Sequence, residues 1–389
     1  MKTLFLTLRT FSATGGIEKV CRVMGKALYE DSVENSGQLT ICSMYDRQQD
    51  AFDNPYFPFE IFRGFAVSKV QFIEEMLRIG RKMDLVILSH INLLVVGATI
   101  RKLSPKTRIV LLAHGIEIWF PVSWQKKWML RHGCDAIWAV SNFTRHKVIE
   151  VHGASSEKCF VLNNCLDPYL PLPTITHKSE RLLQHYGIAP HEKIIMSLTR
   201  ISSRERYKGY DRVVRALALL KEKHPDVRYL VAGKFDEPEK NSLETLAAKL
   251  GLGSQVLMPG YIEDDELEDH FSISDAYVMP SRKEGFGIVF IEAMYYGLPV
   301  VAGNIDGTVD ALLQGSLGQL INPDDIPALA IAIDRVLQHR EQYLPDRTLL
   351  LENFSYETYK RKLRGLLDLI EPVMNGPELI PHMKSAPSA

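Results

Sequence analysis

The sequence holds few cysteines and lacks the short motifs that mark several kinds of phosphate and metal site. Five cysteines occur in 389 residues, and no two of them form a CxxC pair. A dispersed, odd number of thiols is typical of reduced cysteines in a cytoplasmic protein. The chain also has no GxGxxG run, no GK[ST] ending and no Asp-x-Asp pair. These absences argue against a dinucleotide site, a P-loop and a metal held by paired aspartates.

No hydrophobic run is long enough to predict a secretory signal or a membrane span. The apolar run 4–8 is short and Arg9 interrupts it, so it does not read as a signal peptide. The longest apolar segment, 85–100, contains Ser89 and His90 and predicts a strand that turns into a helix. We therefore expect a cytoplasmic protein and leave open a peripheral contact with the cytoplasmic face of a membrane.

Length and charge narrow the class of protein further. A chain of 389 residues can form two domains of ordinary size. Its composition, with 46% hydrophobic and 24% charged residues, is that of a globular protein. The formal net charge of -1 argues against a protein that binds nucleic acid through bulk charge.

Short apolar runs alternate with segments of helical length in both halves of the chain. This alternation predicts an α/β fold made of parallel, doubly wound sheets. The expected strands are 3–8, 39–44, 85–88, 109–113, 136–140 and 159–162 in the first half, and 194–198, 228–232, 256–258, the run from 276 and 300–302 in the second. We expect two Rossmann-like units in tandem.

A cluster of prolines between these units predicts a linker at residues 169–180. The other expected parts are a first domain at 1–168, a second domain at 181–355, a helix at 356–370 that packs back on the first domain, and a disordered tail at 372–389.

Two glutamates, Glu284 and Glu292, stand eight positions apart around a glycine-rich turn. The turn reads EGFG, follows a buried strand, and opens a helix at 288–296. Such a turn lies at the carboxyl edge of a parallel sheet, where open α/β folds bind ligands. The helix start offers free backbone N–H groups, and Glu284 offers an acceptor for the hydroxyls of a sugar or ribose.

Glu292 falls within an otherwise apolar helix, so its burial requires a strong partner. An internal structural acid is the ordinary interpretation of a lone glutamate. The adjoining EGFG turn favours the second interpretation, in which the two carboxylates grip a polyol.

Gly15 and Gly16 follow the first expected strand and open the first helix. The two glycines allow a ligand to approach the backbone, and a helix start favours an anion. An ordinary tight turn explains the pair equally well.

Arg200 ends the first strand of the second half, and Lys208 precedes its first helix. Two cations placed in this way make a good clamp for a diphosphate. A solvated basic loop is an equal alternative, since Arg204 and Arg206 lie in the same loop. Because no Asp-x-Asp pair is present, cations and backbone N–H groups are better candidates for holding a diphosphate than a bound metal.

His114 follows the expected strand 109–113 and is thus predicted at the edge that faces the interdomain cleft. A lone histidine is more often structural, but this position favours a functional role.

A basic aromatic cluster follows His114 and consists of Trp119, Trp124, Lys126, Lys127 and Trp128. Such a cluster can dock on a membrane surface or bind a lipid-linked acceptor. Core tryptophans beside solvated lysines are the more common outcome, and we expect that arrangement here.

In order, these motifs resemble those of the retaining glycosyltransferases of family 4, which have the GT-B fold. The resemblance covers nearly the whole chain. It rests on GGIE at 15–18, HG at 114–115, AVS at 139–141, Arg200 with KG at 208–209, AG at 232–233, PS at 280–281 and the two glutamates.

The resemblance implies a role for each matching position. Arg200 and Lys208 would bind the donor diphosphate, approached by Gly15 and Gly16, and Glu292 would hold the ribose hydroxyls. The donor sugar would be bound by Glu284 and by the backbone of Gly285, Phe286 and Gly287. His114 would lie near the reacting sugar. The nucleotide base would lie near Gly233 and Tyr261.

The chain departs from the family pattern in two places. A segment that usually resembles PNGVD reads NNCLD at 163–167, and a usual GGxxE reads DGTVD at 306–310. The first change affects a loop beside the hinge. The second leaves the role of Asp310 open.

We expect transfer of a hexosyl group from a UDP- or GDP-sugar to a hydroxyl of a glycan, glycolipid or lipid-linked acceptor, without a cofactor or metal. The family resemblance implies retention of configuration. Two alternatives remain: a sugar-nucleotide epimerase of the same fold, and a noncatalytic protein that binds nucleotide sugars. A dehydrogenase is least favoured, because neither half contains GxGxxG.

Overall fold

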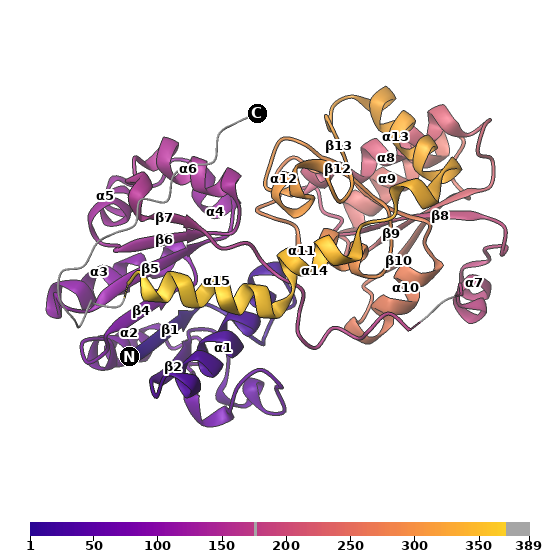
Figure 1. Cartoon of the computed structure of the whole chain (residues 1–389). Coiled ribbons are helices and arrows are strands. Elements are labelled where there is room, and N and C mark those ends of the chain that lie inside the picture. Colours follow the sequence, from indigo (N-terminus) through magenta and orange to yellow (C-terminus); the bar gives the residue numbers. More distant parts are fainter. Residues whose placement is uncertain (175–176, 371–389) are drawn as a thin grey trace.

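The computed structural model describes residues 1–174 and 177–370. Two parallel sheets lie side by side, each covered by helices (Figure 1). The first sheet has the order β3-β2-β1-β4-β5-β6-β7. Its strands are β1 (Lys2–Thr7), β2 (Gln38–Ser43), β3 (Phe62–Gly64), β4 (Leu85–Leu88), β5 (Arg108–Ala113), β6 (Ala136–Ala139) and β7 (Cys159–Val161).

The second sheet has the order β10-β9-β8-β11-β12-β13. Its strands are β8 (Lys193–Leu198), β9 (Val227–Ala232), β10 (Val256–Gly260), β11 (Ala276–Met279), β12 (Val300–Gly303) and β13 (Gln319–Ile321). Both sheets are wholly parallel, so the predicted fold of two Rossmann-like units is confirmed. The order places β1 beside β4, and β8 beside β11, at the points where the winding direction reverses.

Helices follow most strands and cover both faces of each sheet (Figure 1). Those of the first half are α1 (Gly16–Glu34), α2 (Lys69–Gly80), α3 (Leu94–Leu103), α4 (Ile116–Trp119), α5 (Trp124–His132) and α6 (Asn142–His152). The rest are α7 (Glu180–Tyr186), α8 (Tyr210–Leu220), α9 (Glu237–Lys249), α10 (Leu267–Ile273), α11 (Ile288–Tyr295), α12 (Thr308–Ala311), α13 (Ile326–Gln338), α14 (Arg347–Phe354) and α15 (Tyr356–Asp368).

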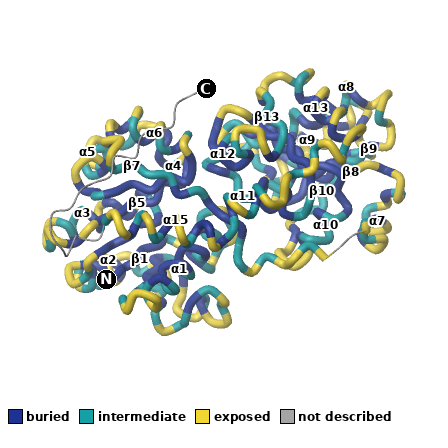
Figure 2. The backbone as a smooth tube through the Cα atoms, viewed as in Figure 1, coloured by how far each residue is buried: buried dark blue, intermediate teal, exposed yellow. Residues whose placement is uncertain are grey.

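The central strands are buried on both faces, as Figure 2 shows for each half. β4 reads LVIL and β6 reads AIWA, and every residue in both is buried. Continuous apolar runs of this kind are what a sheet covered by helices on both faces requires.

Two strands, β3 and β13, do not have that pattern and escape prediction from the sequence. Each has three residues and lies at the edge of its sheet. An edge strand pairs on one side only and tolerates polar residues, so Arg63 and Gln319 fit there.

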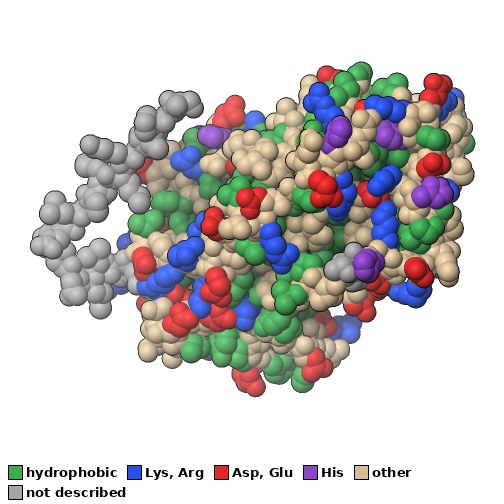
Figure 3. All heavy atoms as spheres, turned by 45° about the vertical axis from the view of Figure 1, so that its right-hand side comes forward, with side chains coloured by type: hydrophobic (Ala, Val, Ile, Leu, Met, Phe, Trp, Pro, Cys, Tyr) green, Lys and Arg blue, Asp and Glu red, His purple; other side chains and the backbone are tan. Residues whose placement is uncertain are grey.

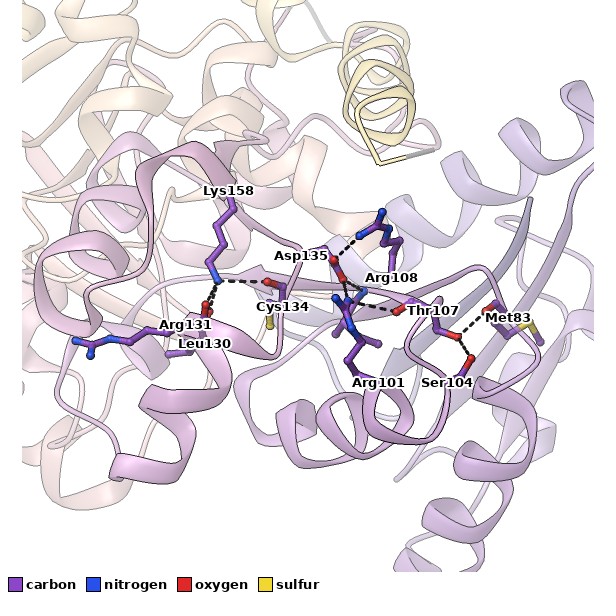
Figure 4. Close-up of polar contacts among 11 residues, drawn as sticks. Met83, Arg101, Ser104, Thr107, Arg108, Leu130, Arg131, Cys134, Asp135 and Lys158 are labelled. Carbon is purple, nitrogen blue, oxygen red and sulfur yellow. Dashed lines mark hydrogen bonds and ion pairs between the residues drawn. The ribbon is translucent and has the colours of Figure 1, made fainter. Parts of the chain in front are cut away.

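Charged side chains organise the amino-terminal edge of the first sheet (Figure 4). The carboxylate of Asp135 accepts from Arg101, from Arg108 at 2.9 Å, and from the backbone N–H of Ile109 at 2.8 Å. The ammonium of Lys158 donates to the carbonyl of Leu130 at 2.8 Å, near the end of α5. These bonds satisfy polar groups at strand starts and at a helix end.

The last helix, α15, belongs by sequence to the second half but lies along α1 in the first (Figure 1). The Tyr356 hydroxyl donates to Glu30 at 2.9 Å, and Arg364 donates to Asp31 at 3.1 Å. The chain therefore crosses between the two halves twice. The expected tail at 372–389 lies outside the described residues.

Charges of both signs are interspersed on the face seen in Figure 3. Among the described helices, none is both long enough and apolar enough to cross a bilayer.

Candidate active site

A half-buried ion pair joins two of the predicted site residues, Lys208 and Glu284. Lys208 ends a short turn (Arg206–Lys208), and Gly209 follows it with φ of +84°. A Cβ on Gly209 would lie 2.4 Å from the carbonyl oxygen of Pro280, so this position requires glycine. Burial lowers the pKa of Lys208, but the nearby charge of Glu284 raises it by more. The pKa of Lys208 therefore lies above its ordinary value. The pair therefore sets a fixed cation beside a carboxylate.

Asp306, which the sequence did not single out as a site residue, holds the backbone of Glu284. Its buried carboxylate accepts from the backbone N–H of Glu284 at 2.7 Å, from the Ser281 hydroxyl at 2.9 Å and from the backbone N–H of Thr308 at 2.9 Å. Burial raises the pKa of Asp306 to about 6, and the nearby charge of Glu284 adds to this effect. Asp306 thus occupies the first position of the altered DGTVD segment and fixes the EGFG turn.

Gly285 and His114 bring the two halves into backbone contact. A Cβ added to Gly285 would lie 1.7 Å from the carbonyl oxygen of His114, and one added to Gly115 would lie 3.0 Å from Cα of Gly285. Real Cβ atoms do not tolerate such distances, so glycine is required at 285. The two predicted motifs, HG and EGFG, therefore meet across the boundary between the halves.

His114 is buried, with 8% of its surface exposed. Its Nε2 lies 2.8 Å from the carbonyl oxygen of Ser89, which can only accept, so Nε2 carries the proton. Its Nδ1 has no hydrogen-bond partner among the described residues. Burial lowers the pKa of His114, against the opposing charge of Glu117. The ring is thus neutral, and its acceptor nitrogen is buried and unpaired.

Glu292 is 2% exposed and has the partner that its burial demands. That partner is Lys19 of α1, whose Nζ lies 2.7 Å from Oε1 of Glu292. Burial lowers the pKa of Lys19, but Glu292 raises it by more, and the net shift is upward. Lys19 was not predicted as a site residue, although the expected burial of Glu292 was a signal for a nearby cation.

The EGFG turn offers its backbone and buries its aromatic ring. Phe286 is 1% exposed and packs edge-on against Phe354, with ring centroids 5.5 Å apart. Gly287 has φ of +86° and precedes α11 with no side-chain cap. The N–H of Phe290 bonds to the carbonyl of Gly287 at 3.1 Å, which leaves the N–H groups of Ile288 and Val289 for solvent or a ligand.

Arg200 is not joined to the Lys208–Glu284 pair. Its Nη1 instead lies 3.2 Å from Glu205, and 60% of its side chain is exposed. The exposed side chain has freedom to reorient toward a ligand.

Gly233 follows β9 with φ of +134°, and its Cβ would lie 1.9 Å from the carbonyl oxygen of Thr199. Tyr261 follows β10, is 36% exposed, and has the Lys234 ammonium 4.6 Å from its ring centroid. Both lie beyond the carboxyl ends of adjacent strands.

In the first half, a Cβ added to Gly16 would meet nothing within 4 Å, which leaves room beside its backbone. A Cβ added to Gly15 would meet the flexible end of the Glu18 side chain at 2.4 Å.

Asp310 accepts from the backbone and the side chain of Asn142, the latter at 3.0 Å. Asp310 therefore ties α12 to the start of α6 across the boundary.

The expectation of core tryptophans is confirmed for Trp119, which is 7% exposed, but it is wrong for the two tryptophans of α5. Trp124 is 75% exposed and Trp128 is 56% exposed, whereas Leu130 of the same helix is fully buried. A helix of nine residues buries one narrow face, and Leu130 occupies it. Lys126 donates to the Asn92 side chain at 2.7 Å.

Within the described residues, no group of three or more histidine, cysteine, aspartate or glutamate side chains is arranged to hold a metal.

Comparisons with known proteins agree with this architecture. The model of "Glycosyltransferase Family 4" matches residues 14–169, and that of "Glycosyl transferases group 1" matches residues 178–360. The chain is 28% identical to a GDP-mannose-dependent alpha-(1-6)-phosphatidylinositol monomannoside mannosyltransferase of Mycolicibacterium smegmatis over 67% of this chain and 70% of that one. It is 27% identical to the mannosylfructose-phosphate synthase of Agrobacterium fabrum, over 59% of this chain and 50% of that one.

Solved structures share the fold. Anabaena HepE in complex with UDP and glucose superposes with a TM-score of 0.78 at 20% identity, over 95% of this chain and all of that one. WaaG, a glycosyltransferase involved in lipopolysaccharide biosynthesis, superposes with a TM-score of 0.64 at 16% identity, over 95% of this chain and 99% of that one.

Proposed function

Because the chain belongs to the family 4 glycosyltransferases of the GT-B fold, we propose that it moves a hexosyl group from a UDP- or GDP-sugar to an acceptor hydroxyl with retention of configuration. The observation that carries this proposal is the meeting of four motif residues at the boundary of the two halves. Lys208 pairs with Glu284, whose turn contacts His114, while Glu292 lies buried on the helix that follows.

The donor diphosphate would lie between Lys208, Arg200 and the backbone at Gly16. Lys208 is held in place, whereas Arg200 is exposed and would swing from Glu205 onto the phosphates. The free N–H groups at the start of α11 add further donors. Glu292 would accept from the ribose hydroxyls, and the base would lie near Gly233 and Tyr261.

A nucleoside diphosphate is a good leaving group once its negative charge is stabilised. Fixed cations and backbone N–H groups supply that stabilisation without reorganisation. A hydrolase that retains configuration through a covalent intermediate needs a free carboxylate as nucleophile. Ion pairs engage both Glu284 and Glu292 here, which favours same-face attack by the acceptor hydroxyl over that route.

His114 is suited to hold the donor sugar. Its Nδ1 is a buried, unpaired acceptor, which would receive a hydrogen bond from a sugar hydroxyl when the surrounding contacts open, while Ser89 fixes the ring through Nε2. Glu284 and the backbone from 285 to 287 would bind the other hydroxyls. Closure of the two halves over the sugar would exclude water and limit hydrolysis.

We propose that no metal takes part in this reaction. Lys208 and Arg200 would neutralise the diphosphate that a cation otherwise bridges, and the chain contains no Asp-x-Asp pair. Activity should therefore survive EDTA.

The acceptor is proposed to be a glycan, glycolipid or lipid-linked sugar. One relative acts on a phosphatidylinositol monomannoside, as its name states. Trp124 and Trp128 project from α5 beside Lys126 and Lys127. Exposed tryptophans with lysines suit the headgroup region of an anionic membrane, so this surface would hold the protein where a lipid-linked acceptor lies.

The test is incubation with UDP-glucose or GDP-mannose, with and without an acceptor pool. A glycosyltransferase releases nucleoside diphosphate and forms a product only when acceptor is present, and NMR of that product gives the anomeric configuration. Sugar conversion without acceptor would support an epimerase. Binding without nucleotide release would support the noncatalytic alternative.

A further inference from the structure

A hollow of about 580 Å³ opens at the carboxyl ends of β1, β2 and β3. It is lined by Arg9 and Ser12 after β1, Tyr45 and Arg47 after β2, and Val67 after β3. None of these residues belongs to the proposed donor site. We call this feature the arginine hollow.

Its two arginines are free of carboxylate partners. Among the described residues, neither Arg9 nor Arg47 makes an ion pair, although both line the same hollow. The Arg9 guanidinium lies 5.4 Å from the centroid of the Tyr45 ring, which restricts its position. By contrast, Arg63 and Arg78 nearby both pair with Glu75. The arginine hollow thus contains two cations that no carboxylate of the described residues neutralises.

The frame of the hollow is rigid. Asp46 is fully buried, and its carboxylate accepts from the backbone N–H groups of Thr10 at 2.6 Å and Ser12 at 2.8 Å, and from the Ser43 hydroxyl at 2.6 Å. The segment after β1 is therefore fastened to the segment after β2, immediately before Arg47. A preorganised rim lowers the entropy lost when a ligand binds.

The third wall contains strained backbone. Ala66 and Val67 have φ of +48° and +75°, and a β-branched residue such as valine rarely adopts this conformation. Their N–H groups bond to the carbonyls of Asp46 at 2.8 Å and Met44 at 3.0 Å, which hold the strained turn. Strain retained in this way is concentrated at ligand sites.

We propose that the arginine hollow binds an oxyanion, a phosphate or a carboxylate, of the acceptor. Two guanidinium forks match such groups in shape and charge. The one acid in the lining, Asp50, accepts from the backbone N–H of Arg47 at 2.8 Å and so serves as a local cap. This inference rests on the proposed function, because it assigns the acceptor to the cleft.

The position suits an acceptor. β1 and β5 are separated only by β4, so their ends lie about 10 Å apart. The hollow spans the ends of β1, β2 and β3, so it extends from about 10 Å to about 20 Å from the end of β5, which His114 follows. Ser12, in its wall, also begins the loop that leads to Gly15 and Gly16. An acceptor anchored by its anionic group would thus direct a hydroxyl toward the reaction centre.

The experiment is calorimetric titration with glucose 6-phosphate, glucose and inorganic phosphate. The protein is first saturated with the nucleoside diphosphate that it binds, so that the donor site is occupied. Wild type should bind both phosphates, and glucose 6-phosphate at least tenfold more tightly than glucose. The Arg9→Ala/Arg47→Ala variant should lose that preference. The matched control, Arg63→Ala/Arg78→Ala, removes equal charge from the same region and should keep it.

Equal phosphate binding by wild type and the Arg9→Ala/Arg47→Ala variant, or none by wild type, would overturn the inference. An unchanged nucleotide affinity in that variant separates this result from failure of the donor site, in which no nucleoside diphosphate would bind at all. Competition by vesicles of phosphatidylcholine with phosphatidic acid would identify a lipid as the source of the anion. If the vesicles do not compete and glucose 6-phosphate still binds, the source of the anion is a soluble acceptor.

Discussion

The ammonium of Lys19 lies 2.7 Å from the carboxylate of Glu292, so an ion pair joins the first helix of one half to the helix that follows the EGFG turn of the other. Glu292 is the acid proposed to hold ribose hydroxyls. In the absence of a donor, Lys19 therefore satisfies the carboxylate that a donor would use. The same contact helps to hold the two halves together.

Replacing Lys19 with alanine should leave a buried carboxylate without a partner. We expect the free energy of unfolding to fall by about 3 kcal/mol and the affinity for nucleoside diphosphate to change with it. Chemical denaturation measures the first effect. The control is Lys147→Ala, which breaks an exposed pair with Glu150 and should cost below about 1 kcal/mol. Equal losses in the two variants would show that the Lys19 pair is a surface contact.

The contact between Gly285 and His114 predicts a sharp effect of a single methyl group. In Gly285→Ala, the new Cβ would meet the carbonyl oxygen of His114 at 1.7 Å, so the halves must separate. A displacement of about 1 Å at a reaction centre costs roughly 100-fold in rate, and we expect a loss of at least that size in steady-state transfer.

The control for this variant is Gly365→Ala in α15, where a Cβ meets nothing within 4 Å. It should retain full activity and gain about 0.5–1 kcal/mol of stability. Wild-type activity in Gly285→Ala would refute the contact.

The raised pKa of Asp306 predicts that the affinity for the donor sugar depends on pH. Its pKa of about 6 means that the carboxylate is charged above pH 6 and takes up a proton below it. Protonation removes a charged acceptor from the N–H of Glu284 and loosens the turn. The affinity for the donor sugar should therefore fall as pH decreases from 7.5 to 5, with a midpoint near 6.

Asp306→Asn mimics the neutral form and should bind donor about tenfold more weakly at pH 7.5, since hydrogen bonds to charged groups are worth about 1.5–3 kcal/mol. Its affinity should lack the step near pH 6. His114 is unchanged in this variant, so a step that persists would have another source and would exclude Asp306.

The exposed aromatic surface of α5 predicts membrane binding. Trp124→Ala/Trp128→Ala should abolish co-sedimentation with anionic vesicles, and binding by wild type should weaken as salt rises. Leu219→Ala removes a side chain that is 61% exposed on α8 and should have no effect. Equal binding by all three proteins, or none by wild type, would contradict the proposed docking surface.

Much of the fold follows from the sequence because buried parallel strands read as continuous apolar runs. The strands with such runs, including β4 and β6, are anticipated within a residue or two. β3 and β13 are not, because β3 reads FRG and β13 reads QLI, so neither presents a continuous apolar run.

Contacts between distant segments could not be read from local patterns. The burial of Glu292 demanded a cation, but its identity as Lys19 depends on how two halves meet, 273 positions apart. Asp306 likewise acts through the folded turn. The tryptophans of α5 show the opposite limit: hydrophobicity favoured the core, but the short helix has room inside for Leu130 alone.

The most direct test of the account is thermal stability with UDP, GDP, ADP and NAD, each with and without EDTA. A ligand at 100 times its Kd stabilises a protein by about 2.7 kcal/mol. We predict stabilisation by one nucleoside diphosphate, insensitive to EDTA and lost in Arg200→Ala and in Glu292→Ala. No response to any diphosphate, or a response to NAD alone, would contradict the proposed donor site.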